Sequence, residues 1–160
     1  MPKNRKDWKM SDKTCLHATL VKLQSKGILL TGKSGSGKSD LALRLIENKA
    51  AELVADDVVE VCRQGDFLYG SAADNLRGML EVRGVGIVTY PYLKQTPIDL
   101  VVHLVDEATA VERLPVAHNE LILGLEIKQI DLYAKENSAP DKIVAALRHS
   151  DIFKQTGESC

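Results

Sequence analysis

The sequence predicts one α/β domain with a mixed β-sheet, and three observations support this prediction. The chain has 160 residues, a length that favours a single domain, and its 44% hydrophobic content is enough for one core. Short apolar or alternating runs typical of strands outnumber the two stretches with helical periodicity. A hairpin expected at residues 58–70 favours a mixed sheet over a strictly alternating α/β arrangement.

The two ends of the chain are predicted to lie outside this domain, which we place at residues 15–150. Residues 1–14 carry five basic and two acidic side chains, and Trp8 and Met10 are their large apolar groups. Terminal segments with so few apolar anchors usually stay solvated. We therefore expect flexible tails at residues 1–14 and 151–160.

In the first half of the domain, apolar patterns predict two strands and one helix. Residues 15–23 show a period of two, with Leu16, Ala18 and Leu20 on one face, which predicts one strand. After a turn, the apolar run at residues 28–31 is typical of a buried strand. Residues 39–48 repeat apolar side chains at helical spacing, and this stripe consists of Leu41, Ala42, Leu45 and Ile46.

The second half is predicted to be rich in strands and to end in a helix. Extended segments are expected at residues 53–55, 58–63, 67–69, 79–82, 85–88 and 98–105. Residues 121–125 and 127–132 are ambiguous between two strands and a strand with a turn. Ser138 begins an S-x-x-D cap with an early proline, which predicts a helix running to about His149.

The composition argues against nucleic acids and membranes as partners. Acidic and basic side chains number 22 and 21 and the isoelectric point is about 6.4, whereas nucleic-acid-binding domains are usually basic. Aromatic residues make up 4%, too few for a base-stacking platform. We find no apolar run long enough for a bilayer and no signal-peptide pattern. Three scattered cysteines suit reduced thiols, so we expect a cytoplasmic protein.

A glycine-rich motif lies between a predicted strand and a predicted helix. It matches G-x-x-x-x-G-K-[ST], in which glycines let backbone N–H groups turn toward phosphate oxygens and the helix N-terminus adds partial positive charge. The lysine supplies a cation for the β- and γ-phosphates, and the last hydroxyl completes the ligand shell of Mg²⁺. We therefore predict a P-loop domain that binds a nucleotide or polyphosphate through Gly32, Lys33, Ser34, Gly35, Ser36, Gly37, Lys38 and Ser39.

Two further segments carry groups that could act on a phosphate. Asp56 and Asp57 follow a predicted strand, the position at which an NTPase places its metal-side acid. Adjacent strand residues point to opposite faces, so at most one of the two can face a γ-phosphate; a turn-forming pair is the alternative interpretation. Glu81 and Arg83 lie close together with two glycines, a pattern that by itself also fits an ordinary strand with a bulge.

Together, these segments resemble the catalytic domain of bacterial HPr kinase/phosphorylase. That family carries a histidine-containing strand, a G-x-S-G-x-G-K-S loop, an L-V-A-D-D strand end and a signature of the form L-E-[IV]-R-G-[LV]-G-I. All four occur here in family order, at residues 17–21, 32–39, 53–57 and 80–87. The resemblance covers residues 15–105 well. The chain is similar to the short form found in some bacteria, without the N-terminal domain of longer members.

The resemblance implies a catalytic role for four residues. His17 would orient the acid on the acceptor side or share a proton with it, and Asp57 would be the base that takes the proton from an incoming serine hydroxyl. Lys38 would neutralise the transferring phosphoryl group, and Arg83 would steady the signature loop or a phosphate. A carboxylate base suits this chemistry because an unactivated serine hydroxyl is a poor nucleophile.

The resemblance also implies cofactors, a partner and an assembly. ATP would be the donor, with Mg²⁺ held by Ser39 and Glu81. The acceptor would be a serine of HPr, the small phosphocarrier of a phosphotransferase system. In the reverse direction inorganic phosphate would attack the phosphoserine and release pyrophosphate. Family members form hexamers, so we expect a homo-oligomer.

The sequence departs from the family pattern in two places. Ala18 stands where glycine usually follows the strand histidine. The family's C-terminal P-V-R-P-G-R loop should fall at residues 132–140, which contain Lys135 but no arginine. Lysine does not reproduce the planar, bidentate phosphate contacts of arginine. We therefore expect phosphorylase activity to be weaker than kinase activity.

Two other classes of function stay open on the sequence. One is a P-loop small-molecule kinase or GTP hydrolase, although the nearest string to a guanine-reading N-K-x-D segment, at residues 48–51, lacks the aspartate. Residues 106–125 also offer only Arg113 to an arginine-rich lid. The other is a non-catalytic nucleotide-sensing module, in which Asp57→Asn would change nothing.

Overall fold

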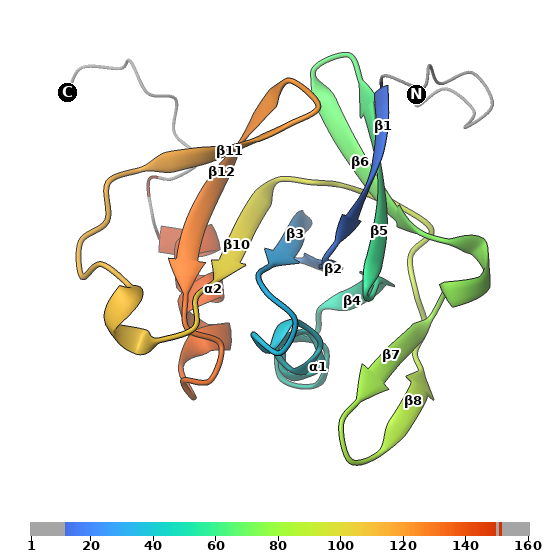
Figure 1. The fold of residues 1–160 in the computed structure, drawn as a ribbon, viewed down its shortest axis with the longest axis horizontal. Coiled ribbons are helices and arrows are strands. Elements are labelled where there is room, and N and C mark those ends of the chain that lie inside the picture. Colours follow the sequence, from blue (N-terminus) through green and yellow to red (C-terminus); the bar gives the residue numbers. More distant parts are fainter. Residues whose placement is uncertain (1–11, 150, 152–160) are drawn as a thin grey trace.

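A computed structural model describes residues 12–149 and 151, which form three sheets and two α-helices (Figure 1). The largest sheet has six strands in the order β11 (His118–Ile122), β12 (Leu125–Leu132), β10 (Leu100–Leu104), β3 (Lys26–Thr31), β2 (Thr19–Leu23) and β4 (Glu52–Ala55). A four-stranded sheet has the order β1 (Lys13–His17), β5 (Val58–Gln64), β6 (Phe67–Ala72) and β9 (Thr96–Pro97). The remaining elements are the hairpin β7 (Met79–Val82) and β8 (Gly86–Thr89), with helices α1 (Lys38–Lys49) and α2 (Ala139–His149).

The strand directions in the six-stranded sheet place several loops at one edge. Strand β10 pairs in parallel with β3 and β12, while β2 pairs antiparallel with both β3 and β4, so β4 runs in the same direction as β3. The carboxyl ends of β3, β4, β10 and β12 therefore meet at the same edge. In α/β sheets, ligands bind outside the carboxyl ends of the strands. This edge is therefore where a site is expected.

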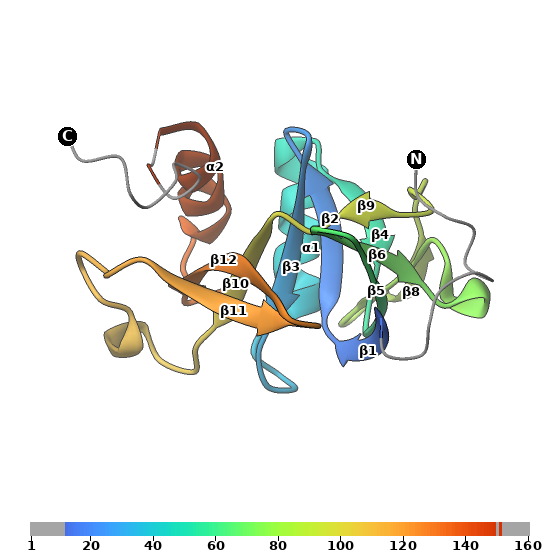
Figure 2. The same cartoon turned by 90° about the horizontal axis from the view of Figure 1, so that it is seen from above.

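Both faces of the central strands are buried, and each face packs against a different layer. Along β3, Ile28 and Leu30 belong to a cluster with residues of α1 and α2, whereas Leu29 belongs to a cluster with β5 and β6. Neighbouring strand residues point to opposite faces, so one face packs on the helices and the other on the four-stranded sheet. In Figure 2, α2 lies beside the β10–β12 part of the sheet, and β5 and β6 lie beside the β2–β4 part.

Most predicted elements are confirmed with small shifts at their ends. The mixed sheet and both helices are present, and α1 begins directly after a left-handed N-cap residue, Gly37. The ambiguous residues 121–132 form parts of two strands, β11 and β12, which are joined by a turn at Leu123 and Gly124, both with positive φ. A positive φ at two successive residues is the geometry of a tight hairpin turn.

Three of the predictions are wrong in detail. Residues 15–23 are not one strand, because the chain passes at Ala18 from β1 in the four-stranded sheet to β2 in the six-stranded sheet. The hairpin at residues 58–70 lies in the four-stranded sheet, so the central sheet is mixed because of β2 and β11 instead. The predicted N-terminal tail ends too late, since Lys13 and Thr14 pair with Cys62 and Val61 of β5.

The tails predicted at residues 1–14 and 151–160 fall mainly outside the described residues, which include only residues 12–14 and Asp151 of these segments. Among the residues that are described, none of the helices is both long enough and apolar enough to cross a bilayer.

Candidate active site

The glycine-rich loop at residues 32–37 connects β3 to α1, and its glycines are required by its shape. Gly32 has φ of +140°, and a Cβ there would lie 2.8 Å from the carbonyl oxygen of Leu104. Gly37 has φ of +100°, and a Cβ there would lie 3.1 Å from the Cβ of Ala134. The loop therefore sits directly against the last residue of β10 and the segment that follows β12, in a backbone conformation that favours glycine.

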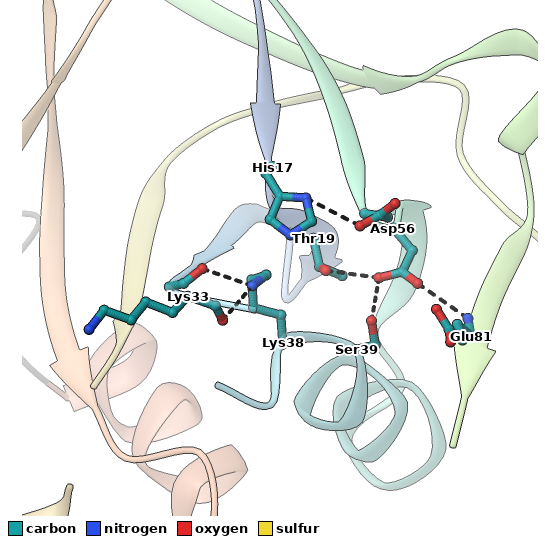
Figure 3. Close-up of polar contacts among 9 residues, drawn as sticks. His17, Thr19, Lys33, Lys38, Ser39, Asp56 and Glu81 are labelled. Atoms are coloured by element: carbon teal, nitrogen blue, oxygen red, sulfur yellow. Dashed lines mark hydrogen bonds and ion pairs between the residues drawn. The ribbon is translucent and has the colours of Figure 1, made fainter. Parts of the chain in front are cut away.

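Lys38 folds back over this loop instead of extending into solvent. Its Nζ donates hydrogen bonds to the carbonyl oxygens of Gly32, at 2.8 Å, and Lys33, at 2.9 Å (Figure 3). Burial lowers the pKa of the Lys38 ammonium from its usual value, and the negative charges of Asp57 and Asp56 oppose that shift. The two acceptors of the ammonium are neutral carbonyl oxygens. A bound anion would form stronger hydrogen bonds with the ammonium and could draw it away from them.

Asp56 is buried at the end of β4 and accepts three hydrogen bonds. Its Oδ1 accepts from Thr19 Oγ1 at 2.9 Å and from Ser39 Oγ at 2.7 Å, and its Oδ2 accepts from the backbone N–H of Glu81 at 3.2 Å (Figure 3). The residue is 7% exposed. Asp56 therefore joins the starts of β2 and α1 to β7, and it fixes the Ser39 hydroxyl beside a carboxylate.

Asp57 is adjacent in sequence but lies in a different environment. It has a positive φ of 67°, a conformation that aspartate tolerates better than most residues. Its side chain is 66% exposed, and its Oδ1 lies 3.2 Å from Nδ1 of His17 at the end of β1. A backbone hydrogen bond from Ala18 N–H to the Asp57 carbonyl oxygen, at 3.3 Å, joins the same two segments. The left-handed turn therefore directs the two carboxylates to different surroundings.

The β7–β8 hairpin contributes one predicted residue to this centre and leaves another apart. Glu81 lies next to Asp56, joined to it through its backbone N–H, and its side chain is exposed (Figure 3). Arg83 lies in the exposed turn at residues 83–85, and its side chain makes no hydrogen bond or ion pair with the other described residues. Of the four predicted catalytic residues, Arg83 is therefore the one whose side chain has no polar partner among the described residues.

The segment after β12 is held by an arginine that the sequence analysis did not single out. Arg44 of α1 donates hydrogen bonds to the backbone carbonyl oxygens of Ala134 and, at 3.1 Å, Glu136. It also pairs with Asp40 at 3.2 Å. Lys135 lies in this segment with an exposed side chain. Arg44 therefore fixes the segment that packs beside Gly37. This segment falls within residues 132–140, which lack the arginines of the family's C-terminal loop.

Asp56 and Thr19 are the other site residues that the sequence analysis did not assign. The Asp56-Asp57 pair was a usable signal, since only one of two adjacent acids can face a given point, but the pattern did not say which. Thr19 offered no signal, because its contact with Asp56 joins residues 37 positions apart. Both become visible only when the start of β2 and the end of β4 are placed side by side.

These residues fit a bound polyphosphate with Mg²⁺. Ser36 Oγ is buried and has no hydrogen-bond partner among the described residues, so it is available to a ligand oxygen. Within residues 12–149 and 151, no three His, Cys, Asp or Glu side chains gather as a metal centre. Mg²⁺ does not require such a cage, because it is usually bound through one or two carboxylates together with substrate phosphates and water. Ser39, Asp56 and Glu81 could supply the protein ligands of Mg²⁺.

Comparisons with known proteins find relatives of this chain both by sequence and by fold. The family model described as "HPr Serine kinase C-terminal domain" matches residues 8–159. The HPr kinase/phosphorylase of Alkaliphilus metalliredigens is 39% identical over 147 residues, which cover 84% of this chain and 47% of the relative. That of Clostridium tetani is 47% identical over 90 residues, covering 56% of this chain and 29% of the relative.

A solved structure, the Hpr(Ser) kinase/phosphatase from Coxiella burnetii, matches with a TM-score of 0.75 and 27% identity, covering 84% of this chain and 94% of that one. The chain spans about half the length of curated relatives such as that from Alkaliphilus metalliredigens, of which the match covers 47%. Because the family model matches nearly the whole chain, the chain belongs to the HPr serine kinase C-terminal domain family.

Proposed function

We propose that this chain is an ATP-dependent protein kinase that phosphorylates a serine of the phosphocarrier HPr. The observation that carries the proposal is the exposed Asp57 carboxylate, paired at 3.2 Å with His17 beside the loop that holds Lys38. Similarity to proteins named HPr kinase/phosphorylase supports the choice of acceptor. A nucleotide-sensing module would have no use for an exposed carboxylate–imidazole pair at this position.

In the proposed reaction, the serine oxygen of the acceptor attacks the γ-phosphorus of ATP. The new bond joins that oxygen to phosphorus, the bond between phosphorus and the β,γ-bridging oxygen breaks, and ADP leaves with the electron pair. Asp57 accepts the hydroxyl proton, a role that requires a carboxylate which solvent and an acceptor can reach. His17 keeps the carboxylate oriented through its Nδ1 contact.

The remaining residues bind and align the phosphates. The backbone N–H groups of residues 32–39 and the Ser36 hydroxyl would hold the phosphate oxygens. Lys38 would exchange its two carbonyl partners for the β- and γ-phosphates, a change from neutral to charged acceptors that strengthens its hydrogen bonds. Ser39, Asp56 and Glu81 would hold Mg²⁺, which when bound neutralises charge on the phosphate oxygens. Their hydrogen bonds support this assignment.

The role of Arg83 and the rate of the reverse reaction both depend on how a phosphate is held near the acceptor. The exposed turn that carries Arg83 leaves the guanidinium free to approach a phosphate or the acceptor once either is present. Phosphorolysis would need a second phosphate held near the serine. The cation nearest that role in the 133–138 segment is Lys135, which lacks the bidentate geometry of arginine. We therefore propose slow phosphorolysis, and, from the family resemblance, a homo-oligomeric cytoplasmic enzyme.

The test is transfer of label from γ-³²P-ATP to purified HPr in the presence of Mg²⁺. We expect radioactive HPr, with the label mapped to one serine and absent when that serine is replaced by alanine. Lys38→Ala serves as the inactive control. Label that appears only as inorganic phosphate, or only on a small molecule, would show that the proposed acceptor is wrong.

A further inference from the structure

An open cavity of about 390 Å³ lies beside the His17 end of β1. It is formed between β1, β3 and the β11–β12 hairpin, which belong to the two large sheets. Most of its lining is apolar, with Leu29 fully buried and Ile122 7% exposed. The other leucine side chains that line it are Leu16, Leu121 and Leu123.

The walls of the cavity are tied to each other by a hydrogen bond between the two sheets. Arg63 of β5 donates a hydrogen bond from Nη1 to the carbonyl oxygen of Leu123, at 2.9 Å, and so ties the β11–β12 turn to the four-stranded sheet. A Cβ at Gly124 would lie 2.8 Å from that same guanidinium nitrogen, so Arg63 packs closely against the backbone of the turn. A pre-formed apolar cavity loses little conformational entropy when a side chain enters it.

His17 belongs both to this cavity and to the proposed reaction centre. Its ring lines the cavity, and its Nδ1 faces Asp57. A serine whose hydroxyl reaches Asp57 must therefore place its neighbouring residues close to the cavity, since successive Cα atoms are about 3.8 Å apart. Leu121, a residue that is 66% exposed, lies in the cavity wall and is open to an approaching chain.

We propose that this cavity receives an apolar side chain close in sequence to the acceptor serine and so selects the protein substrate. The inference rests on the proposed kinase function and adds a substrate preference to it. Leucine, isoleucine, methionine or phenylalanine would bury apolar area against Leu16, Leu121 and Leu123, whose side chains are still partly accessible. Glu120 also lines the cavity, and its negative charge disfavours an acidic residue at the same position of the acceptor.

The test compares Leu121→Glu with Leu114→Glu, a matched control. Leu114 is 91% exposed and does not line the cavity, so both variants place the same charge at an exposed leucine. We expect Leu121→Glu to raise the KM for HPr about tenfold or more, the size expected for losing one buried apolar side chain. The KM for ATP and the melting temperature should match wild type, and Leu114→Glu should leave both KM values unchanged.

A second arm replaces, one at a time, the apolar residues near the acceptor serine of HPr with serine. One replacement should raise the KM with the wild-type enzyme and cause little further loss with Leu121→Glu, because both changes remove the same contact. An unchanged KM for HPr with Leu121→Glu, while wild type transfers label normally, would overturn the cavity assignment alone. A shift in oligomer mass without a change in KM would show that a second copy occupies the cavity, which also overturns it. No transfer by wild type to any serine acceptor would overturn the kinase function itself.

Discussion

The two sides of the turn after β4 hold adjacent carboxylates in opposite ways. On the inner side, Asp56 is 7% exposed and accepts hydrogen bonds from Thr19, Ser39 and Glu81. On the outer side, the Asp57 side chain is 66% exposed and has His17 as a partner at 3.2 Å. A buried carboxylate that accepts several hydrogen bonds has a fixed orientation, whereas an exposed carboxylate can accept a hydrogen bond from an incoming hydroxyl. The inner acid therefore suits a metal and the outer acid suits a base.

The largest effect that separates the two sides is expected from Asp57→Asn. Asparagine tolerates the positive φ at this position, so the fold should be unchanged. Loss of a general base should lower phosphate transfer to HPr by roughly 10²- to 10⁴-fold. Rapid-quench kinetics with labelled ATP measure that change, and calorimetry should give an ATP affinity equal to wild type. Unaltered transfer by this variant would remove Asp57 as the base.

A stability difference of intermediate size should follow from the hydrogen bonds at Asp56. Asp56→Ala leaves the hydroxyls of Thr19 and Ser39 and the N–H of Glu81 without their acceptor, which should lower the free energy of unfolding by about 1–3 kcal/mol. Asp57→Gly is the matched control, because glycine adopts a positive φ without strain. Urea titrations of both variants give the comparison. Equal losses in the two would contradict it.

The smallest effect is expected from His17→Gln. Exposed ion pairs contribute about 1 kcal/mol or less, and the His17 and Asp57 side chains are 57% and 66% exposed. If His17 only orients Asp57, transfer should fall about fivefold, and the double variant with Asp57→Asn should be no slower than Asp57→Asn alone. Steady-state transfer rates of wild type, His17→Gln, Asp57→Asn and the double variant test whether His17 acts through Asp57. Additive losses would mean that His17 acts independently of Asp57.

The sequence was informative where the chemistry is local and uninformative where it depends on long-range pairing. The glycine spacing at residues 32–39 predicted the connection between a buried strand and α1, because the motif contains both the loop and the helix start. The alternation at residues 15–23 hid the change of sheet at Ala18, since β1 and β2 have the same period and differ only in their partners.

In the candidate site too, some features were expected from the sequence and others depend on the packing of distant segments. The closeness of His17 and Asp57 was expected from the family resemblance, and the two residues are in contact. Which of the two aspartates is buried depends on the left-handed turn at Asp57 and on Thr19, neither of which has a sequence pattern. The cavity beside His17 lies between two sheets, so it too could not be predicted before their packing was known.

The division of roles between the two aspartates is tested most directly by titrating Mg²⁺ in single-turnover transfer from ATP to HPr. If Asp56 holds the metal and Asp57 takes the proton, Asp56→Asn should need more Mg²⁺ for half-maximal rate and recover as Mg²⁺ rises. Asp57→Asn should show the wild-type Mg²⁺ dependence with a rate that stays low at every concentration. Recovery of Asp57→Asn by Mg²⁺, with Asp56→Asn unresponsive, would contradict the assignment of both residues.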